Sequence, residues 1–357
     1  MSESSPEPDA ESVGQTDPLF PDALFRNKKK KGRFRIVEAP TPPLEAPVAD
    51  THAHLDLVRD PSLALARCAI HGVRFVCAMA DVFENEAVDY DKLDAWRSDA
   101  EARLPEVLEA SQRALEESSS DPKAAEDAVR ASVCPLEVPH VRIAIGCHPH
   151  YAKHYDDALE ERLIARLGDP RTCAIGEVGL DYHYDFSPRT AQREAFRRQI
   201  RLAHKTGLPI ILHLREAHEE AYRIMEEEGF PEAGVLLHCF NLDWAVLEPW
   251  VEKGCYAAFG GPLTFKKSDE VREAARHMAR GRILTETDSP YMTPEPMRGM
   301  ECGPEHTVFT AARLAEVLGS APGEERRELL EAVYESALSL LDRAPTPWQA
   351  SREEGRS

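Results

Sequence analysis

The sequence has no hydrophobic run near the roughly 18 residues that a membrane-spanning helix requires. Its first residues, MSESSPEPDA, also lack the basic start and apolar centre of a secretory signal peptide. From these absences we expect a cytoplasmic protein without a membrane partner.

Paired cysteine motifs are absent as well. The eight cysteines are scattered, and no two follow the CxxC spacing of many zinc and redox sites. Most of them lie in apolar runs, where a reduced thiol packs as a small hydrophobic side chain. We therefore expect free thiols and no disulfide framework.

Positive charge is scarce, because 43 Lys and Arg residues face 63 Asp and Glu residues and the formal net charge is −20. Broad binding of duplex nucleic acid depends on neutralising phosphates with Lys and Arg, so this composition argues against it. Any phosphate chemistry needs a local source of positive charge, and bound metal ions can supply it.

The two ends of the chain lack the apolar periodicity of a folded core. Residues 1–46 are rich in Ser, Pro, Glu and Asp and include the basic run NKKKKGRFR at 27–35, so we expect a disordered tail. We interpret the basic run as a solvated segment, with a nucleic-acid tether as the alternative. Residues 344–357 are expected to form a frayed C-terminal tail, which leaves 47–343 as a single folded domain.

Within that domain, short apolar runs alternate with segments of helical period. One such segment, 190–207, places Phe196, Ile200 and Ala203 on one face and ends at a glycine. Alternation of strand and helix predicts parallel strands joined by right-handed crossovers, and eight such units close into a (β/α)8 TIM barrel of the α/β class. The expected strands are 47–53, 73–80, 141–147, 173–178, 209–214, 234–239, 255–260 and 283–288.

One connection is much longer than the others. About 60 residues, 81–140, separate the second expected strand from the third, and 104–132 has the pattern of two acidic amphipathic helices around a Ser-rich turn. We interpret this helical insert as structural padding. The alternative is a lid, because a segment that leaves the C-terminal end of a barrel strand starts beside the site.

Two histidines, His52 and His54, lie one residue apart in the first expected strand, within ADTHAHLD. Positions i and i+2 of a strand point to the same side, so the two imidazoles can share a metal ion. Because the C-terminal ends of barrel strands converge on one rim, potential ligands at other strand ends are expected to meet them there. Those further residues are Glu177, His213, His238 and Asp288.

Each of these residues also has a simpler explanation. His213 could be a core histidine, Asp288 could cap the following helix, and Glu177 could pair with a nearby arginine. Six coincidences at matching strand ends are less probable than one site, and six ligands exceed the three that one catalytic zinc ion uses. We therefore predict two divalent metal ions, of Zn²⁺, Mn²⁺ or Mg²⁺, that share a bridging carboxylate.

Six sequence motifs surround these residues: DTHAHLD (50–56), GCHPHYA (146–152), AIGEVGLDYHYD (174–185), PIILHLREAHEEA (209–221), GVLLHCF (234–240) and LTETDSPYMTPEPMRG (284–299). As a set they resemble the TatD family of metal-dependent hydrolases and deoxyribonucleases, which belongs to the amidohydrolase-like barrels. The resemblance spans residues 48 to about 320.

The resemblance implies roles for individual residues. A first metal ion would be held by His52, His54, Glu177 and Asp288. A second would be held by Glu177, His213 and His238, which makes Glu177 the bridge. Glu177 and Asp288 would be catalytic, with Asp288 as a general base on the attacking water. Substrate-binding roles would fall to His148, Arg215, Asp181, Tyr182 and His183.

The implied activity is that of a deoxyribonuclease, which cleaves phosphodiester bonds of DNA in single strands or at ends with metal-activated water. The enzymatic alternative is a metallohydrolase of an ester or amide bond in a small molecule or an aminoacyl-tRNA. The non-enzymatic alternative is a metal-dependent scaffold whose acidic insert binds a partner, although a full ligand set costs stability unless metal fills it. We expect no obligate protein partner.

Overall fold

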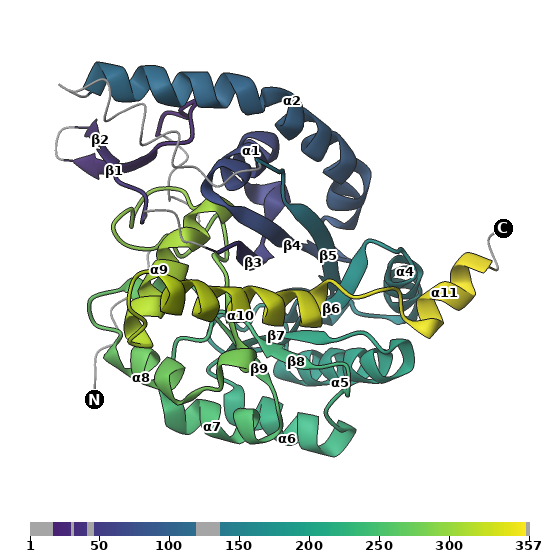
Figure 1. Cartoon of the computed structure of the whole chain (residues 1–357). Helices are drawn as coiled ribbons and strands as arrows, with labels where there is room; N and C mark the ends of the chain where they lie inside the picture. Colours follow the sequence, from purple (N-terminus) through teal and green to yellow (C-terminus); the bar gives the residue numbers. More distant parts are fainter. Residues whose placement is uncertain (1–16, 30–31, 41–45, 119–135, 355–357) are drawn as a thin grey trace.

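The eight strands expected from the sequence form one parallel sheet, ordered from β3 to β10, with helices around it (Figure 1). The computed structural model describes residues 17–29, 32–40, 46–118 and 136–354. The predicted (β/α)8 barrel is therefore confirmed, with strand bounds that differ by a few residues. The strands are β3 (Val48–Ala53), β4 (Val73–Asp81), β5 (His140–Gly146), β6 (Thr172–Asp181), β7 (Ile210–Arg215), β8 (Val235–Leu237), β9 (Tyr256–Phe259) and β10 (Ile283–Thr285).

The barrel closes where β3 meets β10. The Thr51 hydroxyl donates to the carbonyl of Thr285 at 3.0 Å, and the Thr285 hydroxyl donates to the carbonyl of Ala49 at 2.8 Å. A parallel bridge then joins Ala53 to Ser289. This seam holds the C-terminal ends of the first and last barrel strands side by side.

Helices follow the strands in the order expected of a barrel. They are α1 (Pro61–His71), α2 (Glu86–Ser118), α4 (Asp157–Leu167), α5 (Arg189–Thr206), α6 (His218–Glu228), α7 (Trp244–Glu252), α8 (Asp269–His277), α9 (Thr307–Val317), α10 (Glu324–Leu341) and α11 (Pro347–Glu354). Local sequence sets their ends: Asp60 caps α1 by accepting the N–H of Leu63 at 2.9 Å, and Gly72 ends it with a φ of 79°. The predicted glycine stop at Gly207 is also present, with a φ of 68°.

The interior of the barrel is apolar and is covered at its N-terminal end. Phe75, Met79 and Ile211 belong to an interior cluster together with Leu340 and Leu341 of α10. Figure 1 shows α10 crossing the strands from β3 toward β6. Because this end is filled by hydrophobic side chains, polar groups that point into the barrel gather at the opposite mouth.

The expectation of a disordered tail over 1–46 is wrong for its described parts. Strands β1 (Phe25–Lys29) and β2 (Arg33–Val37) pair as an antiparallel hairpin that includes most of the basic run. The Phe25 side chain is 4% exposed, and its ring centroid lies 4.3 Å from that of His71 and 4.7 Å from that of Phe309. The hairpin is ordered by this contact with distant elements, which local sequence periodicity does not reveal.

The long connection after β4 is a helical insert, as expected, although the bounds of its helix differ, and the C-terminus also differs from expectation. A single helix, α2, begins at Glu86 and continues through Pro105 to Ser118, so the first of the two expected helices starts much earlier than predicted. The second expected helix falls mostly on 119–135, outside the described residues. The C-terminal tail, expected to fray, contains α11, where the Gln349 amide donates to the carbonyl of Leu167 at 3.0 Å.

Seven of the eight cysteines lie in described segments, and all seven are free thiols, as expected. Among the helices of the described residues, none combines the length and the apolar character that crossing a bilayer demands.

The Phe25 contact leads to a stability prediction. Phe25→Ala removes a buried aromatic ring and should lower the free energy of unfolding by about 3 kcal/mol, which thermal unfolding will register as a lower midpoint. Leu19→Ala is the matched control, because Leu19 belongs to the same segment but is 45% exposed. Equal midpoints for the two variants would show that the hairpin contributes nothing to the stability of the barrel.

Candidate metal centre

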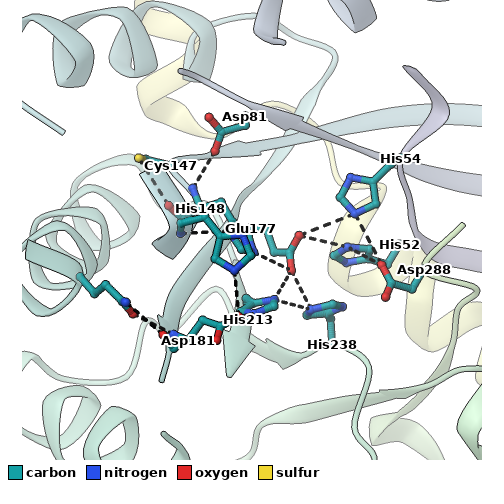
Figure 2. Close-up of polar contacts among 12 residues, drawn as sticks. His52, His54, Asp81, Cys147, His148, Glu177, Asp181, His213, His238 and Asp288 are labelled. Atoms are coloured by element: carbon teal, nitrogen blue, oxygen red, sulfur yellow. Dashed lines mark hydrogen bonds and ion pairs between the residues drawn. The ribbon is translucent and has the colours of Figure 1, made fainter. Parts of the chain in front are cut away.

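The Glu177 carboxylate lies at the centre of the barrel mouth, on β6, and is 7% exposed. Its Oε2 atom lies 3.4 Å from His52 Nε2 and 3.8 Å from His54 Nε2. Its Oε1 atom lies 2.6 Å from His213 Nδ1 and 2.7 Å from His238 Nε2. Figure 2 shows this carboxylate between the two pairs of imidazoles, so each oxygen faces a different pair.

Asp288 joins the first of these pairs. Its Oδ1 atom lies 3.5 Å from His54 Nε2 and 3.8 Å from His52 Nε2. The backbone N–H of Asp288 donates to the carbonyl of His52 at 2.9 Å, so the seam of the barrel also fixes this carboxylate. Its φ of 62° lies in the left-handed region, which Asp adopts more readily than most residues.

The structure thus brings together all six residues that the sequence predicted as ligands (Figure 2). Three groups of potential ligand atoms lie within 4.8 Å of one another: His52, His54 and Asp288; His52, Glu177 and His238; and His148, His150 and His213. A metal with ligands at about 2.0–2.2 Å places neighbouring tetrahedral ligands about 3.3–3.6 Å apart. The distances of 3.4 Å from Glu177 Oε2 to His52 Nε2 and 3.5 Å from Asp288 Oδ1 to His54 Nε2 lie in this range, and the other two distances around these oxygens are 3.8 Å.

His52 gives a test of whether the residues fit a metal ion. Its side chain is completely buried, yet neither ring nitrogen has a hydrogen-bond partner. A buried polar atom without a partner costs free energy, so such atoms normally have a ligand. Burial and the neighbouring His238 lower the pKa of His52 to about 4, which keeps the imidazole neutral, the form that binds a cation.

The charges around the centre also favour a cation. Burial alone would raise the pKa of Glu177, but the surrounding imidazoles hold it well below its usual value, so the carboxylate is ionised. Despite burial, which opposes the charged form, hydrogen bonding to Asp288 and the charge of Glu177 raise the pKa of His54 to about 9. Burial also opposes the charged form of His213, but the charge of Glu177 and a hydrogen bond to Asp181 raise the pKa of His213 to about 9. Protons on these imidazoles occupy the places that a cation would take.

Asp181 does not have the place expected of a substrate-binding residue, because its side chain is completely buried. Its Oδ2 atom lies 2.9 Å from His150 Nε2 and 3.1 Å from His213 Nε2, while Oδ1 accepts the backbone N–H groups of His183 and Tyr184. These contacts oppose the effect of burial and hold the pKa of Asp181 below its usual value. A carboxylate that accepts the second ring N–H of a potential metal ligand orients that imidazole.

The His148 side chain points toward Glu177 (Figure 2). Its Nδ1 accepts the backbone N–H of His150 at 3.2 Å, which leaves the proton on Nε2, and Nε2 lies 3.7 Å from Glu177 Oε1. Its own backbone N–H donates to Asp81 Oδ2 at 2.7 Å. These two hydrogen bonds hold His148 in place, and its Nε2 N–H is directed toward the Glu177 carboxylate.

The other expected substrate-binding residues lie at the rim. Arg215 ends β7, and its guanidinium stacks 4.8 Å above a tyrosine ring. The Tyr182 hydroxyl donates to Glu220, and His183 Nδ1 lies 2.8 Å from Glu216 Oε1. Among the described contacts, the polar atoms of Tyr182 and His183 thus pair with carboxylates of the β7–α6 segment.

Sequence reasoning missed three polar residues of the mouth: His150, Asp81 and Glu286. Each had a positional signal, since His150 follows His148 at the HxH spacing, Asp81 ends β4, and Glu286 precedes Asp288 by two residues. Glu286 is completely buried and accepts the backbone N–H of Cys239 at 2.5 Å. Burial and the nearby Asp288 raise its pKa well above the usual value, which favours the neutral form of this carboxyl group.

A parallel barrel whose mouth gathers imidazoles and carboxylates in this way is the architecture of metal-dependent hydrolases. The model of the family described as TatD related DNase matches residues 49–341. The chain therefore belongs to the TatD family of metal-dependent hydrolases.

Individual relatives agree with this assignment. The chain is 40% identical to the uncharacterized metal-dependent hydrolase YabD of Bacillus subtilis over 184 residues, which cover 51% of this chain and 71% of YabD. It is 36% identical to the human 3′-5′ RNA nuclease TATDN2 over 177 residues, 49% of this chain and 23% of that protein. The crystal structure of the TatD homologue YjjV from Escherichia coli shares the fold, with a TM-score of 0.61 at 23% identity over 85% of this chain and all of that one.

A first prediction from this geometry is that divalent cations stabilise the folded chain. At about 100 times the dissociation constant a ligand adds about 2.7 kcal/mol, which raises the midpoint of thermal unfolding by several degrees. His238→Ala should lose most of this shift, whereas His277→Ala, an exposed histidine on α8, should keep it. A midpoint that responds to none of Zn²⁺, Mn²⁺ and Mg²⁺ would rule out a metal centre.

A second prediction concerns Asp181. Asp181→Asn keeps the shape of the side chain but removes the charge that His213 and His150 contact, so the affinity for cations should fall roughly 10- to 100-fold. Titration against a competing chelator measures this, and Asp185→Asn, on the exposed loop that follows, is the control. If Asp181 contacted substrate instead, KM would rise while cation affinity stayed unchanged.

Proposed function

We propose that the protein is a two-cation phosphodiesterase that cleaves DNA in single strands or at ends. The observation that carries this proposal is the position of Glu177, whose two oxygens each face a separate pair of imidazoles. Two half-sites that share one carboxylate suit a pair of divalent ions, as used by many nucleases and phosphatases.

The side chains divide naturally between the two ions. His52, His54, Glu177 and Asp288 would hold one cation, and Glu177, His213 and His238 would hold the other. Bound cations would supply Lewis acidity toward a phosphate oxygen and make water more acidic. Imidazole and carboxylate ligands suit Zn²⁺ and Mn²⁺, and suit Mg²⁺ less well.

The chain's own residues would then bind the phosphodiester and move protons. Burial opposes ionisation of Asp288, but its hydrogen bond with His54 and the nearby imidazoles keep its pKa low, so it is an ionised carboxylate able to accept a proton from the attacking water. His148 directs its Nε2 proton into the centre and can donate it to the phosphate or to the leaving oxygen. Arg215 offers two parallel N–H donors for non-bridging phosphate oxygens.

The relatives support a nucleic-acid substrate without deciding between DNA and RNA. The matching family is described as a DNase family, and the human relative is named as an RNA nuclease. Both polymers present the same charged phosphodiester to the centre, and they differ in the 2′-hydroxyl. Substrate tests therefore need DNA and RNA strands of identical sequence.

The test is hydrolysis of end-labelled single-stranded DNA and RNA with Mn²⁺, Mg²⁺ or Zn²⁺, beside an ester and an amide substrate. Asp288→Ala should slow phosphodiester cleavage by at least about a hundredfold, because it removes both a cation ligand and the proton acceptor. His277→Ala, which lies outside the centre, should cleave at the wild-type rate. Hydrolysis of only the ester or amide would overturn the proposal, and so would cleavage that persists in Asp288→Ala.

A further inference from the structure

Exposed large hydrophobic side chains are concentrated at the mouth of the barrel. Five such side chains occur in the described residues, and four of them follow the C-terminal end of a barrel strand. Scattered exposed apolar residues are ordinary on a protein surface, but a cluster beside a candidate active site indicates a binding surface. The four are Leu57 after β3, Phe83 after β4, and Tyr184 and Phe186 after β6, exposed by 46%, 42%, 41% and 57%.

Two histidine rings, those of His150 and His148, lie between the Tyr184–Phe186 pair and the metal centre. The two aromatic rings stack on each other, with centroids 5.3 Å apart and planes inclined by 16°. The ring of His150 lies 4.8 Å from Phe186 and 4.2 Å from His148, whose Nε2 faces Glu177. Aromatic surface therefore begins two rings away from the bridging carboxylate.

Phe83 extends this surface past β5 to the C-terminal end of β4. Its ring stacks on His154 at 4.4 Å, with parallel planes, and lies 5.3 Å from the ring of Tyr151. Asp81 accepts the backbone N–H of Phe83 at 2.8 Å and that of His148 at 2.7 Å. One partly buried carboxylate thus accepts backbone N–H groups from both the residue with the exposed aromatic ring and a histidine of the centre.

We propose that Phe83, Tyr184 and Phe186 form a platform on which the unstacked bases of a single-stranded nucleic acid pack while its backbone crosses the metal centre. This inference rests on the proposed function and deepens it by selecting single strands over duplexes. Stacking on aromatic rings needs exposed base faces, tolerates any base sequence and requires no positive charge. Duplex bases are already stacked on one another, so they offer no such faces.

Two cationic side chains lie beside the aromatic rings of the platform. The Arg215 guanidinium lies 4.8 Å above the Tyr184 ring, and Lys153 Nζ donates to the carbonyl of Phe186 at 3.1 Å. In the same loop, the Asp185 carboxylate is paired with Arg189 at 2.8 Å. Cations beside rings are the combination that binds a single strand, with phosphates on the cations and bases on the rings.

The platform can be tested by binding. The ligands are a labelled oligothymidylate of about ten nucleotides with slowly hydrolysed phosphorothioate linkages, and a strand of equal length without bases. Wild-type protein with its cations should prefer the base-bearing strand, and Phe186→Ala and Phe83→Ala should each weaken that binding about tenfold, as measured by fluorescence anisotropy. Binding of the abasic strand should not change. Leu19→Ala, equally exposed but outside the mouth, is the control.

A spectroscopic signature separates stacking from a general loss of structure. A 2-aminopurine base within the strand should lose fluorescence on binding to wild type and to Phe186→Tyr, but much less on binding to Phe186→Ala. Equal weakening for base-bearing and abasic strands, or tight binding of a duplex, would overturn the platform even where hydrolysis proceeds. Retained stacking without phosphodiester hydrolysis would instead overturn only the proposed function.

Discussion

The buried Glu177 carboxylate is the group on which the arrangement of the mouth depends. Removing a carboxylate from water is costly unless charged or polar partners surround it, and here imidazoles contact both of its oxygens. The imidazoles are themselves crowded, since the rings of His52 and His238 stack at 4.0 Å. Protonating every imidazole to balance the carboxylates would set like charges against one another. Bound divalent cations would resolve this conflict, because they would neutralise the carboxylates and bind the imidazoles in their neutral form.

The topology of the barrel places one half of this centre on its closing seam. His52 lies in β3 and His54 directly follows that strand, while Asp288 lies in the segment after β10, where the first and last strands meet. The other half comes from β6, β7 and the residue that follows β8, on the far side of the mouth. A pair of cations that shared Glu177 would therefore link the seam between β3 and β10 to strands β6, β7 and β8 on the opposite side of the barrel. Metal binding and closure of the barrel would reinforce each other, since each positions the same side chains.

Some features of the fold and of the centre could be predicted from the sequence and others could not, because only some of them depend on local sequence patterns. Strand–helix alternation and the HxH spacing are local patterns that can be read from the sequence. In a parallel barrel the C-terminal ends of all strands meet at one rim, so both the barrel and the meeting of six side chains could be predicted. The β1–β2 hairpin was not, because Phe25 is buried by residues from α1 and α9 that no local pattern connects to it. The contacts of Asp181 could not be predicted from the sequence either, and its position in a motif suggested substrate contact. Only the contacts of its two oxygens reveal a carboxylate that orients histidines.

The acidity of the whole chain restricts how a nucleic acid could be held. With a net charge of −20, long-range attraction of a polyanion is not available, although salt screens distant carboxylates beyond roughly 10 Å at ordinary ionic strength. The attraction between the protein and a nucleic acid must then act at short range, through individual side chains and bound cations. Cations at the centre would contact the reacting phosphate, Arg215 would contact its oxygens, and aromatic rings would add affinity that does not depend on charge. A surface built this way distinguishes strands by whether their bases are free to stack, whereas a broad basic surface would bind any polyanion.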